Sequence, residues 1–118
     1  MNNIVKEKSF QFALDIVSLY QNLKKQNEFV ISKQLMRSGT SIGANVEEGS
    51  AAQTKKDFIA KMSIASKEAR ETRYWLRLLQ QSKLVNIDFS EHLNSIEELI
   101  KILTSIVKTA QNRENSKL

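Results

Sequence analysis

Apolar residues recur along this chain at spacings of three and four residues, a periodicity that indicates amphipathic α-helices. It divides the sequence into four stretches, expected as helices over about residues 4–25, 29–49, 55–83 and 89–112. The third and fourth stretches alternate spacings of four and three without a break, which favours near-antiparallel packing at about 20°. Short polar turns separate the stretches, and the chain has no proline. We therefore predict an all-α fold, an antiparallel up-and-down four-helix bundle that forms a single domain over residues 1–118.

The first stretch carries two apolar stripes. One consists of Phe10, Ala13, Leu14, Val17 and Tyr20, and the other of Phe12, Ile16, Leu19 and Leu23. The second stripe widens the face defined by the first, and this breadth suits a bundle helix that is buried on more than one side. A polar segment ends the stretch, and the turn is expected near residues 26–28.

All three glycines of the chain lie in one run of small residues, RSGTSIGANVEEG, from Arg37 to Gly49. The helical period continues through this run, which favours a helix over a loop. Two glycines inside a helix cost roughly 1 kcal/mol each relative to alanine, so we expect them to permit close approach of another helix. The predicted helix-packing or subunit contacts here are Ser38, Gly39, Ile42 and Gly43. Gly49 is interpreted as the stop signal of the second helix.

The third stretch holds the whole excess of positive charge. The formal net charge of the chain is +5, and residues 54–84 carry eight Lys/Arg against three Asp/Glu, which is also +5. Thr54 is the expected N-cap of this helix. On a helical wheel one flank is basic, and the opposite flank carries Glu68, Glu71 and Trp75. The basic flank consists of Lys56, Lys67, Arg70, Arg73, Tyr74 and Arg77.

Each flank has two interpretations. A basic flank with one tyrosine suits contacts to nucleic-acid phosphates, but the arginines can equally pair with acids on neighbouring helices. An acidic flank with a tryptophan suits a protein interface, but Trp75 can equally lie in a second buried layer of the bundle. The two flanks can also contact each other between subunits. In a ring, the acidic flank with Trp75 of one subunit would meet the basic flank of its neighbour.

Residues that carry catalysis or bind metals are sparse. The chain has no cysteine and a single histidine, His92, which we place at the surface. The segment SGTSIG lacks the Gly-Lys-Ser/Thr ending that a phosphate-binding loop needs. We therefore predict a protein that is not an enzyme and has no cofactor and no metal. No signal peptide or apolar span is evident, so we expect a cytoplasmic protein without a membrane partner.

Three segments together carry a resemblance to a known family. They are Arg37–Gly49, Thr54–Phe58 (TKKDF) and Lys67–Leu76 (KEARETRYWL), and Phe12–Gln21 fits the first helix of the same pattern. The chain resembles the 23S rRNA intervening-sequence proteins over roughly residues 8–110, with Val46 in place of the common isoleucine. The resemblance implies a bacterial four-helix bundle that assembles as a homopentameric ring and whose biochemical role is poorly defined.

A related group, the accessory variability proteins of diversity-generating retroelements, looks like the same bundle and pentamer and binds nucleic acid through basic surfaces. By this likeness Arg70, Arg73 and Arg77 become candidates for an RNA- or DNA-binding surface. Our first hypothesis is thus a homo-oligomer that binds nucleic acid with little sequence readout. The alternative is a protein-interaction scaffold with no role in nucleic-acid binding, in which the charges are used in subunit contacts.

Overall fold

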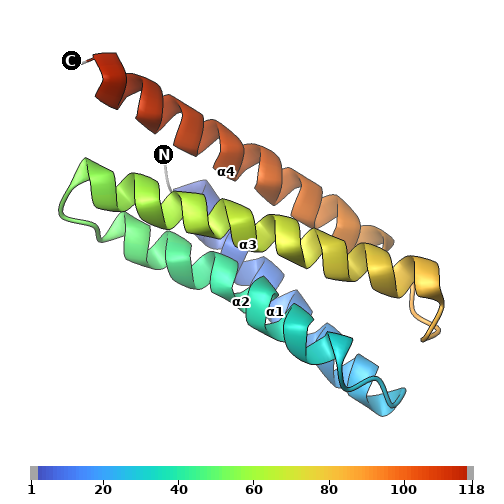
Figure 1. Cartoon of the computed structure of the whole chain (residues 1–118). Coiled ribbons are helices and arrows are strands. Elements are labelled where there is room, and N and C mark those ends of the chain that lie inside the picture. The colour runs from blue at the N-terminus through green and yellow to red at the C-terminus, as the bar shows by residue number, and fades with distance from the viewer. Residues whose placement is uncertain (1–2, 117–118) are drawn as a thin grey trace.

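Four α-helices follow one another along the chain in the computed structural model, which describes residues 3–116 (Figure 1). They are α1 (Asn3–Lys25), α2 (Ile31–Ser50), α3 (Lys55–Ser82) and α4 (Ser90–Ser116), so α4 continues beyond the expected end near residue 112. The bundle measures 53 × 22 × 21 Å. Each helix packs on the next one in sequence, and α1 also packs on α4, whereas the diagonal pairs have no backbone contact within residues 3–116. The predicted antiparallel four-helix bundle is confirmed.

Polar side chains set the ends of the helices. The carboxylate of Glu28 accepts hydrogen bonds from the backbone N–H groups of Val30, Ile31 and Ser32, at 3.2, 3.2 and 2.6 Å, and so satisfies the free donors at the start of α2. The Thr54 hydroxyl accepts from the Asp57 N–H at 3.1 Å, as its predicted role as N-cap of α3 requires.

The ends of α1 and α3 are marked by residues in the left-handed region, Asn27 (φ 64°) and Lys83 (φ 57°), and no glycine in the described part adopts a positive φ. The interpretation of Gly49 as a stop signal is wrong, because Gly49 is helical and buried and α2 continues to Ser50. A Cβ on Gly49 would lie 3.2 Å from the Met62 Cε. The absence of a side chain at Gly49 therefore leaves room for Met62 of α3.

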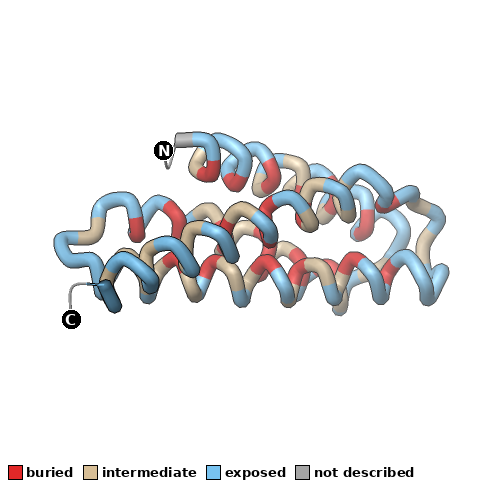
Figure 2. Tube along the Cα trace, turned by 90° about the horizontal axis from the view of Figure 1, so that it is seen from above, coloured by how far each residue is buried: buried red, intermediate tan, exposed pale blue. Residues whose placement is uncertain are grey.

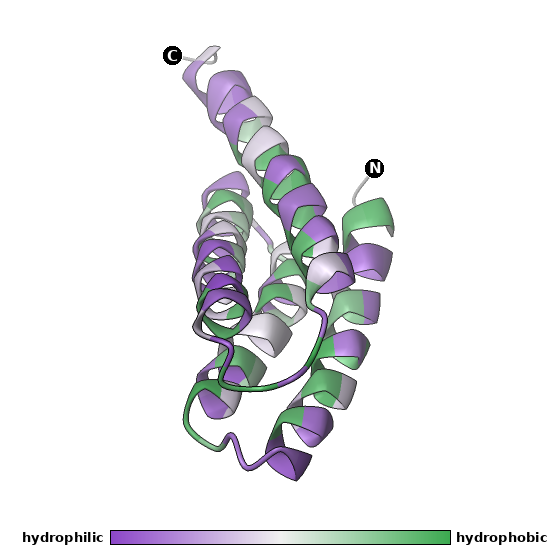
Figure 3. Ribbon diagram, turned by 90° about the vertical axis from the view of Figure 1, so that its right-hand side faces the viewer, coloured by the Kyte–Doolittle hydropathy of each residue, from purple (hydrophilic) through white to green (hydrophobic). Residues whose placement is uncertain are grey.

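The core lies along one stripe of each helix, on the sides that face inward in Figure 2. The heptad series predicted for the third helix is buried from Met62 to Leu79, and Phe58 at its start is half-buried. Hydrophobic residues likewise line the inner sides of the helices in Figure 3. None of the helices in the described part is long and apolar enough to cross a membrane.

The prediction for α1 is wrong in one respect, because its second apolar stripe, not its first, is the core face. Phe12, Ile16, Leu19 and Leu23 are at most 2% exposed, whereas Phe10 and Leu14 are 62% and 48% exposed. The reason is that α1 packs closely on α2 and only sparsely on α4, so a single stripe is covered. Of the other stripe, Phe10 and Leu14 are exposed, and Ala13, Val17 and Tyr20 are half-buried.

Gly39 and Gly43 bring α2 into close contact with α1. A Cβ built on Gly39 would lie 3.0 Å from both the Cγ1 and the Cγ2 of Ile16. A Cβ on Gly43 would lie 3.3 Å from the backbone oxygen of Ser9. Both distances are shorter than ordinary contacts between carbon atoms, so the small residues permit the close approach that the sequence predicted.

The other side of the small-residue run contacts α3. Ser38 and Thr72 are fully buried, and their hydroxyl oxygens lie 2.9 Å apart. Thr72 Oγ1 also lies 2.8 Å from the Glu68 carbonyl oxygen one turn earlier. The two hydroxyls therefore satisfy each other at the seam between α2 and α3.

Removing both hydroxyls of this pair should cost less than the sum of the costs of removing each one alone. Thr72→Val leaves the Ser38 hydroxyl buried without its cross-helix partner, which should lower the free energy of unfolding by about 1–3 kcal/mol. Ser38→Ala with Thr72→Val leaves neither group stranded, so the double variant should lose less than the sum of the single variants. Urea unfolding followed by circular dichroism measures all three changes. Simple additivity would contradict a direct interaction between these hydroxyls.

Candidate nucleic-acid interface

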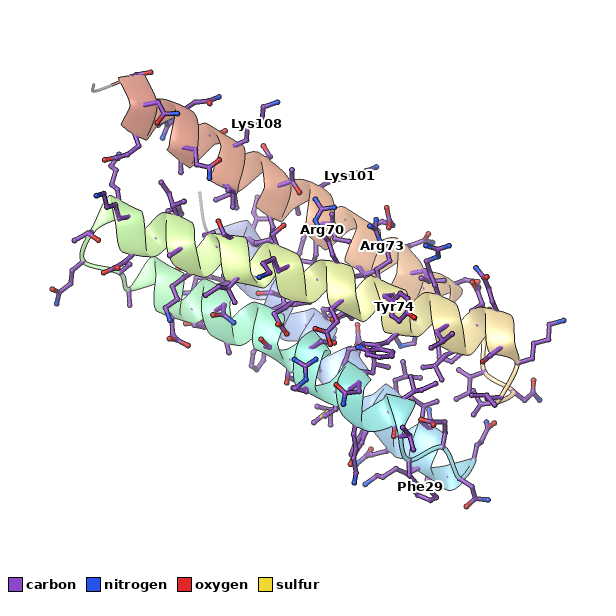
Figure 4. The ribbon with its side chains drawn as sticks, in the orientation of Figure 1. Phe29, Arg70, Arg73, Tyr74, Lys101 and Lys108 are labelled. Carbon is purple, nitrogen blue, oxygen red and sulfur yellow. The ribbon has the colours of Figure 1, made fainter. Side chains whose placement is uncertain are left out.

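The predicted basic flank of α3 lies next to α4. The Arg70 guanidinium donates a hydrogen bond to the Thr104 hydroxyl at 3.1 Å, and Arg73 Nη1 lies 2.7 Å from Glu97 Oε1. Figure 4 shows Arg70 and Arg73 between α3 and α4, with Tyr74 on the adjoining surface of α3. The interpretation that arginines pair with acids of neighbouring helices is therefore correct for Arg73.

Two lysines of α4, absent from the predicted site, extend this surface. Glu97, Lys101, Thr104 and Lys108 follow spacings of four, three and four residues, so they share one side of α4. Because Glu97 and Thr104 contact the α3 arginines, Lys101 and Lys108 lie along the same side and extend outward from α4 (Figure 4). The net charge of the segment did not indicate these two lysines, because residues 85–118 carry four Lys/Arg against five Asp/Glu, a net charge of −1.

Most of these cations have no acidic partner. No ion pair is formed within residues 3–116 by Lys56, Lys67, Arg70, Arg77, Lys101 or Lys108, and all six side chains are exposed. We call these six residues, together with Arg73 and Tyr74, the α3/α4 basic face. Tyr74 is 56% exposed, and its ring lies edge-on to Trp75 with ring centres 5.1 Å apart. The basic face thus combines free positive charge with an accessible aromatic ring.

A single arginine of α2 pairs with both glutamates on the opposite flank of α3. Arg37 forms ion pairs with both Glu68, at 3.2 Å, and Glu71. The indole N–H of Trp75 donates to Glu71 at 3.0 Å, and Trp75 is half-buried against the core, as expected for a second buried layer. Both acids are therefore engaged within one chain. The role of Glu68, Glu71 and Trp75 in subunit contacts stays a prediction.

His92 is half-buried and not at the surface as expected. Burial lowers its pKa, although Asp15, Glu91 and Asp88 oppose the shift, and its Nδ1 has no hydrogen-bond partner in the described part of the chain. Hydrogen bonds from the Ser90 hydroxyl and backbone lower the pKa of the Asp88 carboxyl. Residues 3–116 contain no group of three His, Cys, Asp or Glu side chains that could hold a metal ion.

Fold and surface together define a small helical-bundle protein with a basic face on α3 and α4. The family model described as 23S rRNA-intervening sequence protein matches residues 1–105, and the chain belongs to this family. A crystal structure from Bacteroides thetaiotaomicron, described as a protein of unknown function from the S23 ribosomal protein family, is 50% identical in sequence. The match covers 91% of this chain and 97% of that one, with a TM-score of 0.86. No curated protein of known function matches significantly.

Proposed function

We propose that the protein is a non-enzymatic homo-oligomer that binds RNA or DNA through the α3/α4 basic face, mainly by contacts to phosphates. The observation that carries this proposal is the set of six exposed cations without acidic partners within residues 3–116, drawn from the consecutive helices α3 and α4. Unpaired lysines and arginines bind a polyanion by releasing its condensed counterions. The exposed Tyr74 ring adds a platform on which an unpaired base can stack.

The proposed assembly is a pentameric ring, which follows from the family resemblance, and the surface of α1 supports self-association. Phe10 and Leu14 lie on the same side of α1 and are 62% and 48% exposed, so they offer an apolar surface to a second copy. Five copies would together carry a formal charge of +25, five times the +5 of one chain. A ring would therefore present several basic faces to one nucleic acid and gain avidity.

Fluorescence polarisation with a structured RNA and a DNA duplex, at rising salt concentration, tests the proposal. We expect binding that weakens steeply with salt, in proportion to the number of phosphates contacted. Replacing Arg70, Arg73 and Arg77 together with alanine should weaken binding about tenfold or more and reduce the salt dependence.

Circular dichroism and light scattering of the same variant serve as controls for folding and assembly. No binding at low salt, or equal binding by the triple variant, would refute the proposal. The scaffold hypothesis would then be favoured, because exposed apolar residues such as Phe10 and Leu14 would remain available for a protein contact.

A further inference from the structure

The bundle is incomplete at one end. Helix α1 begins short of the end at which the α2–α3 turn and the C-terminal part of α4 lie, as Figures 1 and 2 both show. The ion pair between Lys8 and Glu98 fixes the register of α1 against α4, so the turns of α4 after about Ile106 extend past Ile4. At this end α3 and α4 lie together without α1.

A groove of about 650 Å³ occupies the position that a longer α1 would fill. Its apolar floor combines Phe58 of α3 with Ile102, Ile106 and Ala110 of α4, and Ile4 and Val5 close one end. Phe58, Ile102, Ile106 and Ala110 are only half-buried, although three of them continue the core stripes of their helices. Such side chains would be covered in a complete four-helix cross-section.

The rim of the groove is cationic. Lys55, Lys101 and Arg113 line its edges, all three are exposed, and none forms an ion pair within residues 3–116. Among residues 3–116, no Asp or Glu side chain lines the groove. A partner that fits must therefore combine an apolar stripe with negative charge on the flanks beside it.

We propose that this groove binds an amphipathic helix with acidic flanks from a partner protein. The α4 residues that line it run from Lys101 to Arg113, which corresponds to about 18 Å, or three helical turns. An apolar stripe of three to four turns laid into a helical groove is a common mode of peptide recognition. The bound helix would lie against α3 and α4 beyond the first described turn of α1.

A second copy of this chain is a poorer occupant than an acidic helix. The exposed apolar pair Phe10 and Leu14 lies on α1, and α1 carries four lysines against two acids and so repels a cationic rim. The groove shares Lys101 with the α3/α4 basic face, but the proposal can be tested apart from nucleic-acid binding through the apolar floor and through Lys55 and Arg113, which lie outside that face.

The test uses two fluorescent peptides of about 18 residues, enough for five helical turns. Both peptides carry leucines at spacings of three and four residues, which form one apolar stripe on a helix. One peptide has glutamates on either side of this stripe, and the other has lysines. We expect saturable binding of the glutamate peptide to the full chain by fluorescence anisotropy. Ala110→Phe should fill the groove and weaken this binding about tenfold or more, whereas Ala44→Phe, on the exposed side of α2, should leave it unchanged.

Charge reversal gives a second variant that retains the apolar floor. Lys55→Glu with Arg113→Glu should shift the preference from the glutamate peptide to the lysine peptide. Equal binding of both peptides to the unmodified chain, or no effect of Ala110→Phe, would overturn the proposal. So would a change in oligomer mass on Ala110→Phe, since a second copy would then be the occupant. RNA binding of Ala110→Phe should be normal, which separates this proposal from the proposed function.

Discussion

Replacing Gly43 with leucine is expected to force α1 away from α2 and to destabilise the bundle severely. The first side-chain carbon alone would lie 3.3 Å from the backbone oxygen of Ser9, and leucine adds three more carbons beyond it. Overpacking costs about 1–3 kcal/mol where side chains can move. Here a backbone group must move, so we expect a loss of about 3 kcal/mol or more, well above the gain of about 1 kcal/mol from replacing a helical glycine.

Thermal unfolding by circular dichroism and mass by light scattering measure this effect. Gly39→Leu should be about as severe, because its first side-chain carbon would lie 3.0 Å from both γ-carbons of Ile16, a fully buried β-branched side chain that is stiff in a helix. Ala44→Leu is the matched control, since Ala44 adjoins Gly43 and is exposed. If Gly43→Leu folds and assembles as well as this control, the close approach of α1 and α2 is not needed for the fold.

Reversing the charge of Lys101 and Lys108 is expected to weaken nucleic-acid binding about tenfold or more at low salt. Each substitution by glutamate removes a cation from the α3/α4 basic face and adds an anion that repels phosphate. Loss of two phosphate contacts should also reduce the slope of log affinity against log salt by about 2. Polarisation with duplex DNA over a salt series measures both quantities.

The double variant Lys24→Glu with Lys25→Glu is the matched control, because it changes the net charge by the same amount away from the α3/α4 basic face. These lysines are exposed in the last turn of α1. If both double variants weaken binding to the same extent, the effect comes from total charge and not from a face over α3 and α4. A larger effect at Lys101 and Lys108 would locate the binding surface.

The helices and much of the core could be predicted because their signals are local. The buried stripe of α3 follows one heptad series from Met62 to Leu79, and no other series of that helix is equally apolar. Helix α1 differs, because it offers two apolar stripes of similar quality. The choice between Phe10 and Phe12 depends on which neighbours cover α1, and that is a property of the assembled bundle.

The candidate site likewise has a part that local sequence could predict and a part that depends on how the helices pack. Arg70, Arg73 and Arg77 could be found because they crowd one flank of a single helix. Lys101 and Lys108 join them only through the register of α4 against α3, which Arg73–Glu97 and Arg70–Thr104 establish. Arg37 was likewise missed as the partner of Glu68 and Glu71, because the two acids lie more than thirty residues beyond it.

The seam between α1 and α4 is the least extensive of the four helix contacts, and α2 with α3 forms the most extensive. Stability is therefore uneven across the molecule, and regions with few buried contacts open first. Backbone amides in the last turns of α4 should exchange with solvent through local fraying, long before those beside Ser38 and Thr72, which need global unfolding. The hairpin of α2 and α3 thus acts as a slowly exchanging frame, on which α1 and α4 are held with lower free energies of opening.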